Sequence, residues 1–345
     1  MCQVFLLWHI MASSSFYLSA RQRADIASRS RHVWWRLEIP TWLLIVSVYG
    51  GWFATVFYWH QLGPWLGTPL LVWFTTWYMS LQHELIHGHP TRKPWLNQLF
   101  GTLPLAVWYP YGLYRDTHLQ HHRNEHLTLP GDDPEGYYFS RASWESLSPA
   151  MKAVVRLRNT LPGRMLLGPL SDIVSTLTGA LLAVLRGEWR PVTMWLVHGA
   201  MLAVLLGWMA QRGLSPLYFV LAVSYPALSL TKVRSFFEHR AEHAPQARST
   251  LNEAGFVWRL LFLNLNYHLV HHDLPGVPWF ALRQVYFSDR EAYKARSEGF
   301  VVKGYRQWFR DHTRSPVKVE SHPFAPDAIA AQPQRSDYDY QQETL

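Results

Sequence analysis

The stretch HLQHH at residues 118–122 shares its spacing with the stretch HLVHH at residues 268–272. A third histidine group, HELIH at residues 83–87, precedes both. Side chains at positions i, i+3 and i+4 of a helix project from one face, so each stretch can direct its imidazoles at a common point. The three stretches contain eight such imidazoles. Eight are too many for one metal ion, and the pattern therefore predicts a site that holds two.

The composition indicates a membrane protein. Only 16% of the 345 residues are charged, whereas about a quarter is usual for soluble domains. Runs of about 20 apolar residues are long enough to cross a bilayer as helices. Four runs without Asp, Glu, Lys or Arg meet this length: 39–59, 61–82, 191–211 and 213–231. Their spacing predicts two helical hairpins. Two other stretches, 92–115 and 165–185, are interrupted by prolines or by Asp172 and are predicted to lie at the interface.

The basic residues set the predicted orientation, because cytoplasmic flanks of spans are rich in Lys and Arg. Arginines crowd the segment before the first run, and Lys232 and Arg234 follow the fourth. Both termini and the stretch 83–190 are therefore predicted to be cytoplasmic, which places all three histidine groups on one side. The predicted fold class is an all-α integral membrane protein, with a cytosolic helical cap that carries a histidine-rich di-metal site. The bacterial inner membrane is the expected location.

We divide the chain into three parts. Residues 1–38 form a cytosolic N-terminal segment, with Met11 as an alternative start, and residues 39–290 form the membrane domain. Residues 291–345 form a cytosolic C-terminal segment. The polar stretch from about residue 332 has little to bury and is predicted to be disordered.

Charge and cysteine content exclude several classes of function. The net charge of +8 is spread over cytosolic segments next to predicted spans, where anionic lipid headgroups are nearer partners than nucleic acid. The single cysteine, Cys2, excludes disulfide frameworks, cysteine zinc sites and iron–sulfur clusters within the chain. No His-Pro-Gly-Gly haem motif occurs. Electrons for any redox reaction must therefore come from another protein.

The stretch HELIH also fits HExxH, the zinc-protease pattern in which the glutamate acts as general base. Such a site needs one more protein ligand and would leave at least five histidines without a role. An intramembrane zinc peptidase is therefore the weaker alternative, and Glu84 is predicted to be a partner of a ligand. A metal transporter is also disfavoured, because the histidine groups fall at span ends and in cytosolic segments.

At these residues the chain resembles the membrane fatty acid desaturase superfamily, whose members are integral-membrane, histidine-box, non-haem di-iron enzymes. The three histidine stretches carry the resemblance, over roughly residues 40–290. The stretches that support it are 131–134 (GDDP), 238–240 (EHR), 266–268 (NYH) and 275–279 (PGVPW). The resemblance implies that the eight histidines bind iron and that a ninth ligand follows the last span. His239 is the preferred ninth ligand and His243 the alternative. The implied ligands are His83, His87, His118, His121, His122, His239, His268, His271 and His272.

The resemblance further implies two Fe²⁺ ions, O₂ as co-substrate and an external electron carrier such as ferredoxin, rubredoxin or cytochrome b5. The expected reaction is desaturation of a fatty acyl chain, with no catalytic residue beyond the metal ligands. A carotenoid or other lipid hydroxylase or ketolase is the alternative. Ligand imidazoles also need partners for their second nitrogen. Five acidic residues near the stretches are candidate partners for these nitrogens: Glu84, Asp116, Glu125, Glu238 and Asp273.

Overall fold

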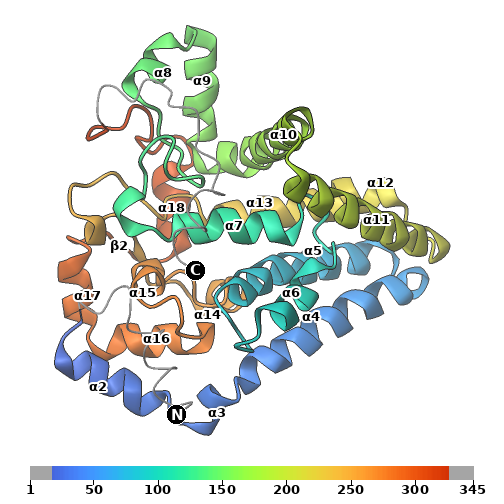
Figure 1. Ribbon diagram of the computed structural model, residues 1–345, viewed down its shortest axis with the longest axis horizontal. Coiled ribbons are helices and arrows are strands. Elements are labelled where there is room, and N and C mark those ends of the chain that lie inside the picture. The colour runs from blue at the N-terminus through green and yellow to red at the C-terminus, as the bar shows by residue number, and fades with distance from the viewer. Residues whose placement is uncertain (1–17, 326–345) are drawn as a thin grey trace.

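The computed structural model describes residues 18–325, and this part of the chain is mostly helical, as predicted (Figure 1). The first elements are α2 (Ala20–Arg29), α3 (Val33–Arg36), α4 (Ile39–Phe57), α5 (Trp59–Ile86), α6 (Pro94–Thr102), α7 (Tyr111–His121) and the 3₁₀ turn η2 (Asn124–His126). The predictions for Cys2, for a start at Met11 and for disorder from residue 332 lie outside the described residues.

The middle of the chain is also helical. Its elements are α8 (Arg141–Ser146), α9 (Pro149–Arg158), α10 (Leu161–Arg186), α11 (Trp189–Gln211), α12 (Pro216–Tyr218), the π-helical turn η3 (Phe219–Ser224), α13 (Tyr225–Arg234) and η4 (Pro245–Ala247). The last part comprises β1 (Leu251–Asn252), α14 (Phe256–Leu261), α15 (His268–Asp273), α16 (Trp279–Ser288), α17 (Arg290–Arg296), β2 (Val301–Val302) and α18 (Tyr305–His312).

Four helices are long and apolar enough to cross a membrane: α4, α10, α11 and the continuous helix Pro216–Arg234. Three of them coincide with predicted runs. The fourth, α10, covers residues 165–185, which were predicted to lie at the interface. It has 26 residues and a mean hydropathy of 1.5, within the range of the other three helices. Its charged residue Asp172 forms an ion pair with Lys232 of α13, so this charge does not stand alone.

Helix α5 contains the predicted run 61–82 but is not among these four helices. It lies in the middle of the helices, in contact with α4, α13 and η3. Its last third, from Tyr78 to Ile86, is buried throughout. A helix covered by protein can carry the polar residues that a lipid-facing helix excludes, and this explains its lower hydropathy. The first turn of α5 is separated from the rest of the helix by a break at Gly63, where φ is 65° and Pro64 follows.

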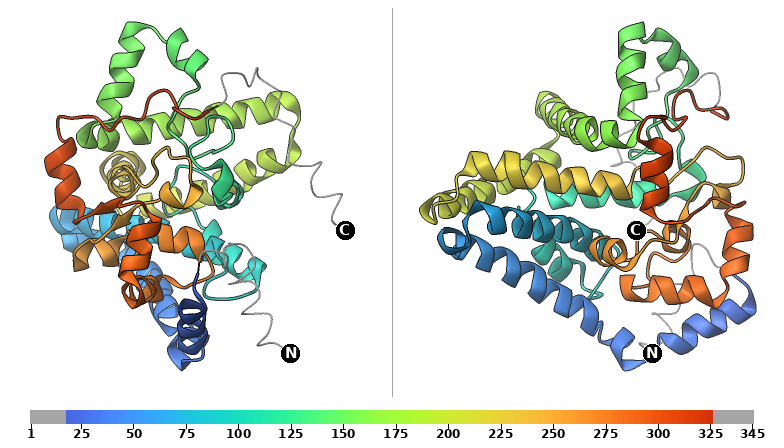
Figure 2. Two further views of the ribbon diagram at one scale, coloured as in Figure 1. Left: turned by 90° about the vertical axis from the view of Figure 1, so that its left-hand side faces the viewer. Right: turned by 180° about the vertical axis from the view of Figure 1, so that it is seen from behind.

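The turns between α4 and α5 and after α11 gather at one end of the molecule, whereas α10 lies across α13 (Figure 2). The turn after α11 meets the turn before α5 there. A Cβ atom on Gly213 would lie 2.3 Å from the ring of His60, and the φ of Gly213 is +79°, so this contact requires glycine. The outer faces of α10 and α11 expose many leucines and valines to the surroundings. Such broad apolar surfaces are typical of contact with lipid.

The helices after α14 gather at the opposite end of the bundle (Figure 1). Residues 251–252 and 301–302 form two short parallel strands there, with Leu251 opposite Val301. A second apolar core joins α2 to this part of the chain: Ile26 packs with Leu282 and Tyr286 of α16. The first core lies between α4, α5 and η3 and contains Trp52 and Phe219. The histidine stretches lie between these two cores.

Candidate metal centre

Three helix ends bring the histidine stretches together. His83 lies in the last turn of α5, which ends before the cap residue His87. The second stretch ends α7, and the third forms α15. The helices α5, α7 and α15 meet near the centre of the molecule (Figure 1). The spacing predicted from sequence is therefore presented by helical backbone at all three places.

The fourth contribution comes from an extended segment. His239 follows α13 and forms an isolated antiparallel bridge with Ser249. No helical periodicity marks this position, so only the family resemblance pointed to it. The bridge fixes the backbone of His239 and directs its side chain toward those of His121 and His268.

The nine predicted histidines form two groups, and in each group one nitrogen per side chain lies within 4.8 Å of all the others. The five-histidine group consists of His83, His87, His118, His122 and His271. The four-histidine group consists of His121, His239, His268 and His272. Both groups are largely buried. The arrangement offers two adjacent positions at which a metal ion can be held.

The spacing of the nitrogens suits a shared ion. The Nε2 atoms of His118 and His122 are 3.1 Å apart, and those of His239 and His268 are 2.9 Å apart. Imidazole nitrogens bind transition-metal ions at about 2.0–2.1 Å, which puts neighbouring ligands around one ion roughly 3 Å apart. The observed distances therefore match those of neighbouring ligands.

The second ring nitrogens determine which atoms face inward. His118 Nδ1 lies 2.9 Å from Glu135 Oε1, and His121 Nδ1 lies 2.8 Å from Asp133 Oδ1. A carboxylate accepts a hydrogen bond there, so the proton sits on Nδ1 and Nε2 keeps a lone pair. Lone pairs that face one another at about 3 Å repel unless a cation lies between them. The chemistry of this donor set thus fits a bound metal ion.

Burial keeps most of these imidazoles neutral. It holds the pKa values of His122, His271 and His272 well below the usual range, and the neighbouring histidines lower them further. Metal binding needs the neutral form of the ring. Burial also lowers the pKa of His121, but Glu135 and Asp133 outweigh it and raise the value to about 8. The acidic partners therefore act mainly on the α7 histidines.

The acidic partners differ from those predicted. Glu238 Oε1 lies 3.5 Å from His268 Nδ1, and Glu84 Oε1 lies 3.8 Å from His83 Nδ1, so these two are near ligands. Asp116, by contrast, pairs with Arg190, and Asp273 with Arg296. The backbone carbonyl of Glu125 accepts a hydrogen bond from Arg248.

The sequence reasoning missed three of the partners that the structure provides: Asp133, Glu135 and Ser249. Asp133 lies within the stretch GDDP, and Glu135 directly follows it. In the sequence this stretch only supports the resemblance to the family. Ser249 Oγ lies 3.1 Å from His239 Nδ1. The signal that could have found the two acids is a run of carboxylates in the loop directly after a histidine stretch.

The remaining candidate residues lie outside both groups. Glu84 accepts a hydrogen bond from the backbone N–H of Trp279 (3.0 Å) and is buried, which suits a structural role better than that of a base. His89 pairs with Glu38 (2.6 Å). His243 stacks on Phe324, with ring centroids 3.8 Å apart. His126 is about half exposed. Of the two candidates for the ninth ligand, His239 belongs to the four-histidine group and His243 lies outside both groups.

Apolar helices of membrane-spanning length and two buried histidine groups define a membrane metalloenzyme class whose ligands are mainly imidazoles. The fatty acid desaturase family model matches residues 59–301, which include all nine histidines, and the chain belongs to this family. Membership makes the protein an oxidoreductase with a lipid substrate and a membrane context. None of the curated proteins compared with the chain matches it.

Proposed function

We propose that this protein desaturates a fatty acyl chain, using O₂ and two iron ions held by the nine histidines. The observation that carries the proposal is the pair of adjacent groups, each with its ring nitrogens within 4.8 Å of one another. Imidazole ligands suit iron, and neutral ligands leave most of its positive charge uncancelled. Iron bound there would supply the reduction of O₂ to an oxidant strong enough to remove hydrogen from an unactivated C–H bond.

The reaction balances with an external source of electrons. One CH₂–CH₂ unit, O₂, two electrons and two protons give one CH=CH unit and two molecules of water. No cysteine occurs among residues 18–325, and we propose that an electron carrier such as ferredoxin, rubredoxin or cytochrome b5 delivers the electrons. No side chain has to act as a nucleophile.

The protein's own residues position and shield the site. Glu135 and Asp133 hold the rings of His118 and His121 by their Nδ1 atoms, which fixes the direction of Nε2. Six of the nine histidines are buried and three are partly buried, which would keep bulk water away from the reacting carbon. These contributions determine ligand geometry before any substrate binds.

An apolar cavity near the site offers room for a lipid chain. It has a volume of about 500 Å³ and lies between α6, α7 and α11, with Tyr111, Met194 and Val197 in its wall. This size falls in the range of small-molecule sites. Gly112 of α7 also lines it, six residues before His118, or about 9 Å along the helix. We infer that the acyl chain passes this cavity on its way to the histidines.

We further propose the membrane arrangement. The helices α4, α5, α11 and Pro216–Arg234 cross the bilayer as the two predicted hairpins, with both termini on the cytoplasmic side. The helices after α14 form a cytosolic cap over the metal ions, and the expected location is the bacterial inner membrane. The exposed apolar faces of α10 and α11 support this arrangement, because they would lie in lipid.

Lipid analysis of a host that expresses the chain tests the proposal. We expect a new acyl species two mass units lighter than its precursor, and loss of that species in His271→Ala. His126→Ala is the matched control, because this imidazole is half exposed and outside both groups. A product 16 or 14 mass units heavier would instead identify a hydroxylase or a ketolase. Wild-type protein that binds two irons but changes no lipid would contradict the proposal.

A further inference from the structure

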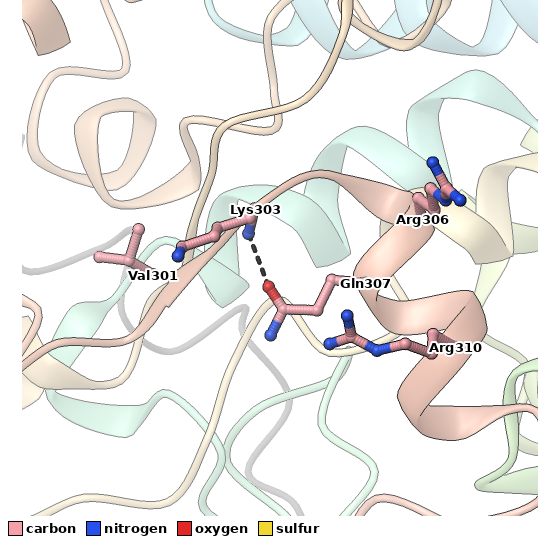
Figure 3. A pocket seen from close by; sticks show the side chains of 5 residues that line it. All are labelled: Val301, Lys303, Arg306, Gln307 and Arg310. Atoms are coloured by element: carbon pink, nitrogen blue, oxygen red, sulfur yellow. Dashed lines mark hydrogen bonds between the residues drawn. The ribbon is translucent and has the colours of Figure 1, made fainter.

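A basic pocket lies on the outer side of β2 and α18, outside the metal centre (Figure 3). It has a volume of about 520 Å³. Its wall consists of Val301, Lys303, Arg306, Gln307 and Arg310. The backbone N–H of Lys303 donates to Gln307 Oε1 (2.8 Å), which ties the strand to the first turn of the helix. Three cationic side chains and no acidic one line this pocket.

The charge of this basic pocket is only partly balanced. Arg310 forms an ion pair with Asp311 (2.7 Å). Neither Lys303 nor Arg306 has an acidic partner within residues 18–325, and both are exposed. The opposite face of α18 is anchored, because Tyr305 and Trp308 are buried. The residue after β2, Lys303, and Arg306 of α18 therefore present two positive charges to the surroundings from an anchored backbone.

A short bonded route joins this basic pocket to the four-histidine group. The carbonyl of Phe300, next to Val301 in the wall, accepts a hydrogen bond from the N–H of Leu251 (3.0 Å). Leu251 is two residues from Ser249, whose hydroxyl lies 3.1 Å from His239 Nδ1. Electron transfer is faster through covalent and hydrogen-bonded atoms than through gaps. Two hydrogen bonds and three peptide units therefore connect Val301 in the pocket wall to a histidine of the site.

We propose that this basic pocket docks the electron carrier, and that the carrier is an acidic one-electron protein. The proposal rests on the proposed function, because it names the partner of the same site. Carrier encounters of this kind use small interfaces and are guided by opposite charge. Each docked carrier loses one electron, so two encounters supply the two electrons of one turnover. The protons of the two waters come from solvent and from the substrate.

The location of the pocket favours a soluble protein over a lipid surface. It lies among the elements after α14, whereas the turns that precede α5 and follow α11 lie at the other end of the molecule (Figure 2). The membrane-spanning helices extend toward those turns. A carrier can therefore reach α18 from the side that holds the histidine stretches.

Carrier binding to the full-length protein in zwitterionic lipid nanodiscs tests the proposal directly. The probe is a reduced acidic [2Fe–2S] ferredoxin, and its dissociation constant is measured at low and at high salt. Reversal of both free charges in Lys303→Glu/Arg306→Glu should weaken binding by about tenfold at low salt. High salt should remove most of that difference. The matched control is Arg314→Glu/Lys318→Glu, which reverses the same charges at exposed residues outside the pocket wall.

The experiment separates the docking proposal from the function on which it rests. Product formation with dithionite in place of the carrier should be equal in the wild type and in Lys303→Glu/Arg306→Glu. Equal carrier affinity of the two charge-reversal variants would overturn the docking proposal. An effect that appears only when the nanodiscs contain anionic lipid would also overturn it, in favour of a lipid contact. Salt-dependent carrier binding without any lipid product would leave the docking surface supported and overturn the desaturase assignment.

Discussion

The five-histidine and four-histidine groups lie side by side but are built differently. The first takes all its members from the three helical stretches, whereas the second includes His239 from an extended segment. A six-coordinate ion would keep one free position in the first group and two in the second. The four-histidine group would therefore leave more of a bound ion open to exchangeable ligands.

The two groups also differ in how their rings are held. In the four-histidine group, Nδ1 of His121 and His239 face Asp133 and Ser249 at hydrogen-bond distance. In the five-histidine group, only His118 has such an acceptor, and both ring nitrogens of His83 lack a hydrogen-bond partner within the described residues. Nδ1 hydrogen bonds therefore hold two of the four rings in the second group but one of five in the first, while Nδ1 of His268 has no such partner among residues 18–325.

The largest expected losses of activity come from substitutions of His121 and His122, which are adjacent in sequence but belong to different groups. His122→Ala removes a ligand from the five-histidine group, and His121→Ala removes one from the four-histidine group. Both variants should lose at least about a hundredfold in activity, because an imidazole that binds the metal is deleted. Iron content and Mössbauer spectra should show a different remaining iron environment in each. Identical spectra in the two variants would contradict the division into two groups.

Changes of the acidic partners should cost less. Asp133→Asn and Glu135→Gln keep the ring contacts but remove the charge that favours Nε2 as the ligand atom. Each should lower iron affinity or activity by about 10–100-fold. Chelator titrations should show the loss in the four-histidine group for Asp133→Asn and in the five-histidine group for Glu135→Gln. Wild-type iron affinity in both variants would mean that packing alone orients the rings.

A smaller effect is expected at the bridge that holds His239. Ser249→Ala removes the hydroxyl next to Nδ1 but leaves the backbone pairing intact. A neutral hydrogen bond contributes about 1 kcal/mol, which corresponds to a severalfold loss of iron affinity. Ser249→Thr keeps a hydroxyl and should restore most of the affinity. Equal losses in the two variants would assign the effect to packing.

The smallest expected effect is on the pH dependence of stability and involves His322, which contacts a hydrogen-bond partner of Asp133. His322 Nε2 lies 3.0 Å from Thr128 Oγ1, and the backbone N–H of Thr128 donates to Asp133 Oδ2. Burial, and then Arg248, lower the pKa of His322 to about 4, below its usual 6.5.

The folded protein thus takes up this proton less readily than the unfolded chain does. The stability that results is complete above about pH 6.5 and is lost as pH falls toward 4. Between pH 7 and pH 5, the Tm of the wild type should fall by about 2 °C more than that of His322→Gln. A larger fall in the variant would mean that His322 gains a proton on folding.

The site was readily predicted where local spacing decides it. The i, i+3 and i+4 positions of His118, His121 and His122 are fixed by helix geometry, and the same holds for α15. Asp133 and Glu135 could not be assigned from spacing, because they reach α7 only through the fold of the loop after it. Their nearness in sequence to the second stretch was visible, but the direction of the loop was not.

The fold shows the same limit. Apolar runs identified α4 and α11, since length and composition are local properties. For residues 165–185 the sequence shows only the charge of Asp172, because its neutralising partner, Lys232, is 60 residues away. For α5 the polar residues reflect burial between other helices, which depends on how the helices are arranged.

Adjacent residues contribute to opposite groups at two places: His121 and His122 at the end of α7, and His271 and His272 in α15. One peptide bond thus connects members of the two groups at each place. An ion bound by either group would therefore also fix the two residues of the other group that are adjacent to its ligands. Loading should therefore be cooperative, and cells short of iron should contain fully metallated and metal-free protein with little of the singly loaded form.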